Sequence, residues 1–245
     1  MPGRTPEDGA ADELAGFLSV LQLSDSAFPS GRYTLSHGLE AMVQSGLLPA
    51  PADPVTLVNL LDSQVRYGVA PSDGIALACA HRATGTGSPD VETIMRADAR
   101  LTAVKLGREA RDASTRTGRA LLDVARVAFT GKTLVGYAEA VETGLTPGNH
   151  AVVLGVLGAE LGVSRVQAVG GELYAFAAGW VSAAVRLSVT DHRTAQGVLH
   201  RVRPALAAAA VEAADLDVAQ ISGCTPLLDV MSMRHEEGGL RLFAS

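Results

Sequence analysis

The chain has 245 residues, of which 47% are hydrophobic and 19% are charged, and its formal net charge at pH 7 is −6. A chain of this length and hydrophobicity can bury a sizeable core, which excludes a disordered protein and predicts one large domain or two small ones. The negative balance also excludes a dedicated nucleic-acid binder, because such a protein needs a clustered basic face.

The N-terminal segment, the cysteines and the most apolar run of the chain predict where in the cell the protein is located. Residues 1–12 are polar and acidic; they predict a disordered leader and lack the apolar core of a secretory signal. Cys79 and Cys224 form no CxxC pair, which indicates two buried thiols in a reducing compartment. The most apolar run, 173–189, is interrupted by Arg186 and is short for a span of about 20 residues, so it predicts a buried core helix. These features predict a cytoplasmic protein without a membrane segment.

Helical spacing of apolar residues dominates the chain from residue 13 onward, and no alternating run typical of a strand occurs. Residues 13–23 and 54–68 each carry an apolar stripe with this spacing. Ser88-Pro89 and Thr146-Pro147 each combine a capping residue with proline, which predicts that helices begin there. Gly162 is a candidate end for the second of these helices.

Residues 164–189 predict a long apolar helix that opens with the capping-box pattern Ser164-Arg165-Val166-Gln167. Three glycines inside this helix should each cost about 1 kcal/mol relative to alanine. Close approach of neighbouring helices would explain them: Gly170, Gly171 and Gly179.

The whole pattern predicts an all-α protein, with one compact domain of about ten short helices over residues 13–233. Residues 234–245 form a C-terminal tail that ends in the apolar-plus-arginine sequence Leu240-Arg241-Leu242-Phe243. Because Arg and Phe are enriched at interface hot spots, we expect this tail to dock on the body or to bind a partner.

Two patterns that look chemical are explained better by structure. Residues 131–133 (GKT) end like a phosphate-binding loop, but the first glycine of that motif is missing and no strand precedes it, so a helix break at Gly131 is expected. The six histidines are scattered, and the pairs Cys79/His81 and His192/His200 are not spaced to chelate unaided. No permanent metal site is predicted; a transient site, or one completed across a subunit interface, stays open.

The stretch 21–40 could supply a Ser–His–acid set from His37 with Ser24, Asp25 or Glu40. Such sets are recognised by geometry, and the elbow GxSxG is absent. Local structure accounts for the residues more simply. Ser24 or Asp25 would end a helix, residues 28–31 would form a turn, Thr34 or Ser36 would cap the next helix and Glu40 would begin its polar face.

Residues 105–125 predict a helix that carries several arginines among acidic residues, which is typical of a solvated, salt-bridged face. Ser114 and Gly118 are small residues four apart, which lets another helix pack close. The segment therefore predicts one packed face and one face available to partners. The arginines are Arg108, Arg111, Arg116 and Arg119.

Four segments together resemble the UreF family of urease accessory proteins. LQLSDSAFPSG followed by SHGLE, within 21–40, resembles its opening signature, and EARDASTRTGRALL (109–122) is similar to its central helix. AAVRL (183–187) with Gln196 resembles its late helix pair, and His235-Glu236 with the final RLFAS resembles its terminus. The four matches occur in the family's order and cover most of the chain from residue 17.

The resemblance implies an all-helical, non-catalytic scaffold for urease maturation that dimerises, binds the accessory protein UreD (also called UreH) and recruits and regulates the GTPase UreG. The assembly would deliver nickel to apo-urease, with nickel in transit and no stably bound cofactor. Two alternatives stay open: a stand-alone nickel-binding chaperone, and a helical enzyme that uses His37.

The resemblance also assigns partner-binding residues by position, and it implies that the tail, 234–245, is ordered by UreD and supports the UreG-binding surface. The assigned residues are Ser26, Phe28, Pro29, Gly31 and Glu40 in the signature, Arg111, Arg116, Gly118 and Arg119 in the central helix, Arg186 and Gln196 in the late pair, and His235, Glu236, Arg241 and Phe243 in the tail.

The chain departs from the family pattern in places. Arg32 stands where the signature has a second glycine, and we expect it only to decorate the surface; Leu35-Ser36 replaces a His–Ser step. Residues 188–192 replace a Pro-Leu-Gly-Gln run, and Gly239-Leu240 replaces a Tyr-Ser pair. These changes bear on partner contacts near 188–195 and 238–240 rather than on the fold.

Overall fold

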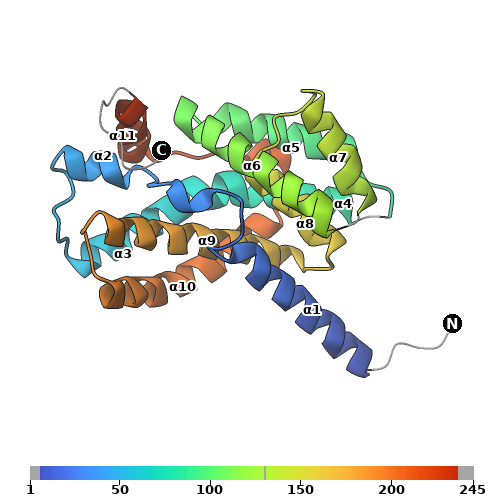
Figure 1. Cartoon of the computed structure of the whole chain (residues 1–245), viewed down its shortest axis with the longest axis horizontal. Coiled ribbons are helices and arrows are strands. Elements are labelled where there is room, and N and C mark those ends of the chain that lie inside the picture. Colours follow the sequence, from blue (N-terminus) through green and yellow to red (C-terminus); the bar gives the residue numbers. More distant parts are fainter. Residues whose placement is uncertain (1–5, 86, 130, 237–245) are drawn as a thin grey trace.

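The computed structural model of the chain describes residues 6–85, 87–129 and 131–236. Within these ranges the secondary structure is helical and contains no strand, which confirms the all-α prediction. Figure 1 shows one body of packed helices, from which α1 (Pro6–Ser24) extends at one end, while α11 (Pro226–Glu236) lies at the other.

The centre of the body is α8 (His150–Glu160), which packs against α4 (Ile75–Thr84), α6 (Arg108–Ala128) and α9 (Arg165–Arg186). Because neighbours cover it on all sides, α8 is apolar around nearly its whole circumference. A Cβ at Gly155 would lie 2.4 Å from the backbone oxygen of Leu77, so glycine is what lets α8 and α4 approach this closely.

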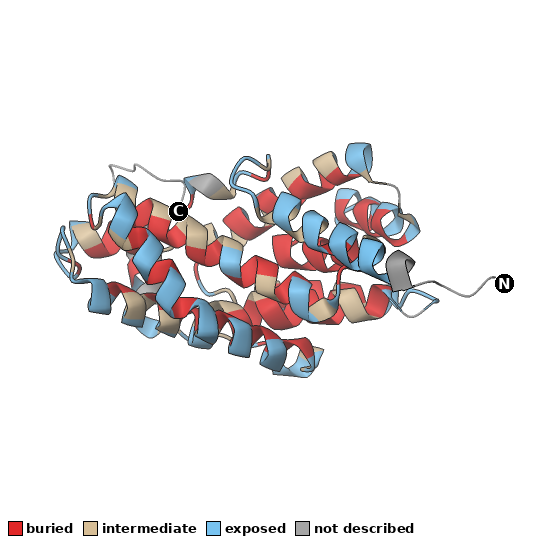
Figure 2. Ribbon diagram, turned by 90° about the horizontal axis from the view of Figure 1, so that it is seen from below, coloured by how far each residue is buried: buried red, intermediate tan, exposed pale blue. Residues whose placement is uncertain are grey.

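The remaining helices surround this centre, and Figure 2 shows buried residues on their inner faces and exposed residues on their outer faces. Helix α9 also packs along α10 (His192–Ala214). The other elements are η1 (Arg32–Thr34), α2 (Leu39–Gln44), α3 (Pro54–Gln64), the π-helical η2 (Val65–Gly74), α5 (Val91–Val104), α7 (Lys132–Glu142) and η3 (Val218–Gln220).

Some predicted helix boundaries are confirmed and others are wrong. The capping box at Ser164 forms, the chain breaks at Gly131 between α6 and α7, and Gly162 follows the end of α8 with a φ of 70°. The starts predicted at Ser88 and Thr146 are wrong by a few residues. Asp90 caps α5 instead, by accepting a hydrogen bond from the Thr93 amide, and the Thr146 hydroxyl binds a buried carboxylate rather than a helix end.

Helix α1 begins at Pro6, so residues 6–12, which were expected to belong to a disordered leader, are helical. The apolar stripe predicted in 13–23 is present, but most of it is exposed. Helix α1 meets the body with another face of its C-terminal half, where Gly16 lies beside Gly162 and Val163 and Val20 lies against α9. A Cβ at Gly171 of α9 would lie 2.8 Å from a Val20 methyl group, so this glycine permits the contact. The exposed side chains are Leu14, Phe17, Leu18 and Leu21.

Helix α9 is the one described helix that is long and apolar enough to cross a membrane by length and composition alone, and 56% of its apolar window is buried inside the protein. A core helix of a folded domain passes the same test. Of the two cysteines, Cys79 is buried as predicted, whereas Cys224 is exposed, so the prediction of two buried thiols is wrong for the second.

Asp98 in α5 is a completely buried carboxylate that organises the segment before α8. It accepts hydrogen bonds from the Tyr137 hydroxyl (2.7 Å), the Thr146 hydroxyl (2.6 Å), the Gly148 amide (2.7 Å), and both the backbone amide and the side chain of Asn149 (2.9 and 2.7 Å). Burial and the adjacent carboxylate raise the pKa of Tyr137 well above its usual value, so its phenol stays a donor. The segment 146–149 is thereby held in one conformation.

This held segment lies directly against α6. A Cβ at Gly118 would come within 2.0 Å of the Gly148 backbone oxygen and 2.8 Å of the His150 amide nitrogen. The prediction that small residues in this helix let another element pack close is therefore confirmed, with the start of α8 as that element.

Candidate functional site

The turn that follows α1 forms one wall of a groove of about 830 Å³, and α9 forms the opposite wall. Helix α1 ends at Ser24, as predicted, and the turn is built from local bonds: the Ala27 amide donates to the Asp25 carboxylate (2.8 Å) and the Phe28 amide to the Asp25 backbone oxygen (3.0 Å). Gly31 then takes a φ of 77°, which favours glycine. Four of the assigned signature residues line this groove: Ser26, Phe28, Pro29 and Gly31.

The floor of the groove is the outer side of α9, where small residues such as Ala178, Gly179 and Ser182 leave the space open. A second cavity of about 360 Å³ shares Tyr174, Ala178 and Ser182 with the first and continues toward α10. Arg186 and Gln196, the assigned late pair, both line this second cavity. The two cavities together are called the α9 groove here, and two motif groups that are far apart in sequence converge on it.

Arg32 does not decorate the surface, and that prediction is wrong. Its guanidinium forms two parallel hydrogen bonds to the Glu172 carboxylate, Nη1 to Oε2 at 2.7 Å and Nη2 to Oε1 at 2.9 Å. The Glu172 side chain is only 5% exposed and that of Arg32 is 20% exposed. A buried carboxylate in an apolar helix needs a charged partner, and Arg32 supplies it from η1.

The same guanidinium contacts His150 at the start of α8, with Nη1 at 3.3 Å from Nε2. Burial, and then the positive charge of Arg32, lower the pKa of His150 to about 4, so the imidazole is neutral at pH 7. Nε2 can then accept from Arg32, while Nδ1 donates to the Thr117 backbone oxygen of α6 at 3.4 Å. One chain of contacts therefore joins η1, α9, α8 and α6.

A charged cavity of about 230 Å³ lies on the inner side of Arg32. Its second ion pair joins Lys105 to both oxygens of Asp73, at 3.0 and 2.8 Å. Burial alone would raise the pKa of Asp73, but Lys105 and the Ser72 hydroxyl hold it below its usual value. Gln64 Oε1 and Ser114 Oγ are buried without a hydrogen-bond partner in the described structure.

His37 lies between the α9 groove and the charged cavity, and lines both. Its backbone has a φ of 53°, which is uncommon for a residue with a side chain, and its ring meets Phe176 edge-on at 4.6 Å between centroids. Burial, and then Arg32, lower the pKa of His37 to about 3.

The acids and the serine that could serve His37 in a catalytic set make other contacts. The Ser24 hydroxyl donates to the Gly171 backbone oxygen (3.3 Å), Asp25 is used within the turn, and Glu40 accepts from the Gln44 side chain (3.2 Å). Glu40 is also almost fully buried, so the prediction that it begins a polar face is wrong. The predicted caps Thr34 and Ser36 are wrong as well, because Gly38 occupies the N-cap of α2.

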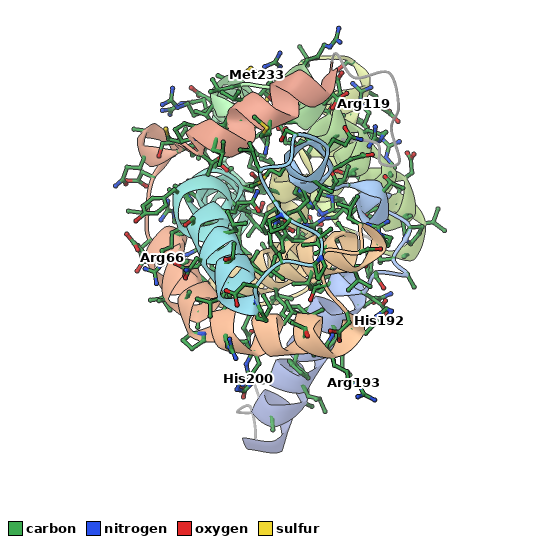
Figure 3. The ribbon with its side chains drawn as sticks, turned by 90° about the vertical axis from the view of Figure 1, so that its left-hand side faces the viewer. Arg66, Arg119, His192, Arg193, His200 and Met233 are labelled. Carbon is green, nitrogen blue, oxygen red and sulfur yellow. The ribbon has the colours of Figure 1, made fainter. Side chains whose placement is uncertain are left out.

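The central helix and the tail form a second region, called the α6–α11 surface here. Helix α11 packs against α6 and α2, and Arg116 and Arg119 of α6 are exposed. Arg111 is partly buried and bonds back to the connection before α6, where Nη1 donates to the backbone oxygens of Lys105 and Leu106, both at 2.7 Å. Figure 3 shows Arg119 with Met233 of α11 on one side of the molecule, and the labelled residues of α10 on the opposite side.

Of the assigned tail residues, His235 and Glu236 are the last two residues of α11, whereas Arg241 and Phe243 lie outside the described residues. The exposed apolar side chains of α11 include Leu227 and Met233. A search of the described residues finds no group of three or more His, Cys, Asp or Glu side chains placed to hold a metal ion.

Comparison with known proteins gives one consistent family. A family model described as UreF matches residues 52–203. The urease accessory protein UreF of Trichodesmium erythraeum is 31% identical over 233 residues, which is 95% of this chain and 98% of that protein. The urease accessory protein UreF 2 of Brucella canis is 32% identical over 230 residues, covering 94% of this chain and 92% of the relative.

A third relative, the urease accessory protein UreF of Bradyrhizobium diazoefficiens, is 33% identical over 239 residues, which is 97% of this chain and 95% of that protein. The relatives thus extend over the groove, the charged cavity and the α6–α11 surface, and not only over the part that the family model matches. The chain belongs to the UreF family of urease accessory proteins.

Proposed function

We propose that this protein is a non-catalytic scaffold of urease maturation in the cytoplasm. As a homodimer it binds UreD/UreH and recruits and regulates the GTPase UreG, and the assembly passes nickel, its cargo, to apo-urease. The observation that carries this proposal is the sorting of the four family motifs into two regions. Four of the five signature residues and the late pair line the α9 groove, while Arg116 and Arg119 of the central helix and helix α11, which contains the start of the tail, form the α6–α11 surface.

Two separate regions suit a protein that holds two partners at once. The α9 groove has small residues on its floor and exposed Tyr174 beside it, which suits a helix or an extended segment. The α6–α11 surface combines exposed arginines with apolar side chains of α11, and Arg with apolar anchors is typical of interface hot spots. Neither region needs a catalytic group.

The test is co-purification of the full chain with UreD/UreH and UreG, with GDP, with a non-hydrolysable GTP analogue and without nucleotide. Formation of a ternary complex supports the proposal, and absence of any complex under all three conditions overturns it. Variants then separate the two regions: Ala178→Trp fills the α9 groove, and Arg119→Glu reverses a charge on the α6–α11 surface. Each substitution should weaken one partner and leave the other within twofold of the unchanged protein.

A further inference from the structure

We infer that Arg32 is a positioning residue, which holds the signature turn in its partner-binding shape by means of the buried carboxylate of Glu172. This inference rests on the proposed function, because it assigns a role in partner recognition to an ion pair of which only Arg32 lines the α9 groove. Arg32 lines both the groove and the charged cavity, whereas Glu172 lines only the cavity and is 4% exposed.

The turn itself is held mainly by bonds between near neighbours. The described hydrogen bonds of residues 25–31 join Asp25 to Gln22, Ala27 and Phe28 to Asp25, Ser30 to Phe28, and the Thr34 hydroxyl to the Gly31 backbone oxygen. Such bonds set the local shape of a turn but do not orient it on the body. Before the turn, the Ser24 hydroxyl donates a single hydrogen bond to the Gly171 backbone oxygen of α9 (3.3 Å), and within the turn Phe28 packs against the core. The ion pair in the residue after Gly31, Arg32, joins the turn to α9 across 140 positions of sequence.

The geometry of the pair can fix an orientation. Two parallel N–H···O bonds constrain the plane of the guanidinium as well as its distance, which a single contact does not. Both side chains are largely buried, so salt screens the pair less than it screens an exposed one. Lysine could supply the charge at position 32 but not the planar fork.

The pair also reaches beyond the groove. His150 accepts from Arg32 and donates to the Thr117 backbone oxygen, next to Gly118, which packs against the start of α8. The orientation of the signature turn is thereby tied to α6, the helix that carries Arg116 and Arg119 of the α6–α11 surface. A change at Glu172 can therefore affect recognition although no partner can contact this buried residue directly.

The experiment compares Arg32→Lys and Glu172→Gln with the unchanged chain and with the control Arg66→Lys. Arg66 contacts Asp62 through Nε at 3.0 and 2.9 Å, but its side chain is 52% exposed and lies outside both regions. Two quantities are measured: the Kd for whichever partner, UreD/UreH or UreG, is weakened by Ala178→Trp in the α9 groove, and amide hydrogen exchange of residues 25–36 relative to α8 and α9. We expect both test variants to raise Kd at least tenfold and to speed exchange in 25–36 selectively, while Arg66→Lys changes neither beyond twofold.

The other possible results of this experiment also support or overturn the inference. Unchanged Kd in folded Arg32→Lys and Glu172→Gln overturns the inference, and so does faster exchange spread evenly over the chain, which would make the pair a general stabiliser. If a single variant does not fold, the double variant Arg32→Gln/Glu172→Gln removes both charges and leaves no buried ion unpaired; it must then show the same weakened binding. If the unchanged chain itself binds neither UreD/UreH nor UreG, the proposed function fails, and the exchange of 25–36 alone decides whether Arg32 positions the turn.

Discussion

The substitution Asp98→Asn isolates the role of the buried carboxylate that organises the segment before α8. The change keeps the size of the side chain but replaces one oxygen by an NH₂ group. In the structure, Oδ2 accepts from the Gly148 amide and two hydroxyls, and Oδ1 accepts from the backbone amide and the side chain of Asn149. Hydroxyls can rotate to accept a hydrogen bond, but a backbone amide cannot. Whichever oxygen is replaced, a backbone N–H therefore faces another donor.

The magnitude follows from two costs. A buried donor left without an acceptor costs about 1–3 kcal/mol, and a hydrogen bond to a charged group makes a net contribution to stability of about 1.5–3 kcal/mol. We expect the free energy of unfolding to fall by about 3 kcal/mol, a large part of the 5–15 kcal/mol that is typical of a folded protein. For a chain of this size, such a loss corresponds to a fall in Tm of roughly 6–12 °C.

The assay is guanidinium unfolding followed by circular dichroism, with Asp215→Asn as the matched control. Asp215 also binds an arginine, Arg165, at 2.7 Å, but its side chain is 79% exposed, so its loss should change stability by no more than about 0.5 kcal/mol. A loss below about 1 kcal/mol for Asp98→Asn would refute the reasoning, because it would mean that the segment 146–149 repacks without its acceptor.

Three further outcomes are expected. Gly118→Ala should lower the free energy of unfolding by more than about 2 kcal/mol in the same assay, because its Cβ would lie 2.0 Å from a backbone oxygen. The control Gly136→Ala, whose Cβ would meet nothing within 4 Å, should stabilise helix α7 by up to about 1 kcal/mol. Equal effects of the two substitutions would contradict this reasoning. The pKa values of His37 and His150, about 3 and about 4, lie below the usual value of 6.5 for an unfolded chain, so the unfolded state takes up protons first as pH falls. The contribution of these histidines to the free energy of unfolding is therefore complete above pH 6.5, and it declines by up to about 1.4 kcal/mol per histidine for each pH unit toward pH 4. Unfolding measured at pH 7.5 and at pH 5.0 tests this. Identical free energies of unfolding at the two pH values would contradict buried neutral rings. Deletion of residues 234–245 should leave a folded dimer with weakened UreG recruitment, and loss of the cooperative thermal transition would show instead that the tail belongs to the core.

Several local features of this fold were readable from the sequence, whereas the partners in its long-range pairs were not. The capping box at Ser164 and the break at Gly131 depend on neighbouring residues, and both were predicted correctly. The helix start predicted at Thr146 failed because a carboxylate 48 positions away, Asp98, binds its hydroxyl. Propensity carries no information about such a competitor.

The candidate site shows the same division. The residues of the signature were named from the sequence, but their meeting with Arg186 and Gln196 along α9 depends on how helices pack. Glu172 was missed as a site residue, although a lone carboxylate within an apolar helix signals a buried ion pair. The sequence therefore indicates that Glu172 forms a buried ion pair, but it does not indicate which arginine is the partner.

The burial of α8 on all sides has a consequence for how the protein unfolds. Helices from residues 75–84, 108–128 and 165–186 all cover it, so any fragment that omits one of these three segments leaves α8 partly uncovered. Its amides can then reach solvent only when the whole body opens, and their exchange rates report the global free energy of unfolding. Fragments that begin after α4 or end before α9 would expose part of this apolar helix, and we expect the protein to unfold as one cooperative unit rather than in halves.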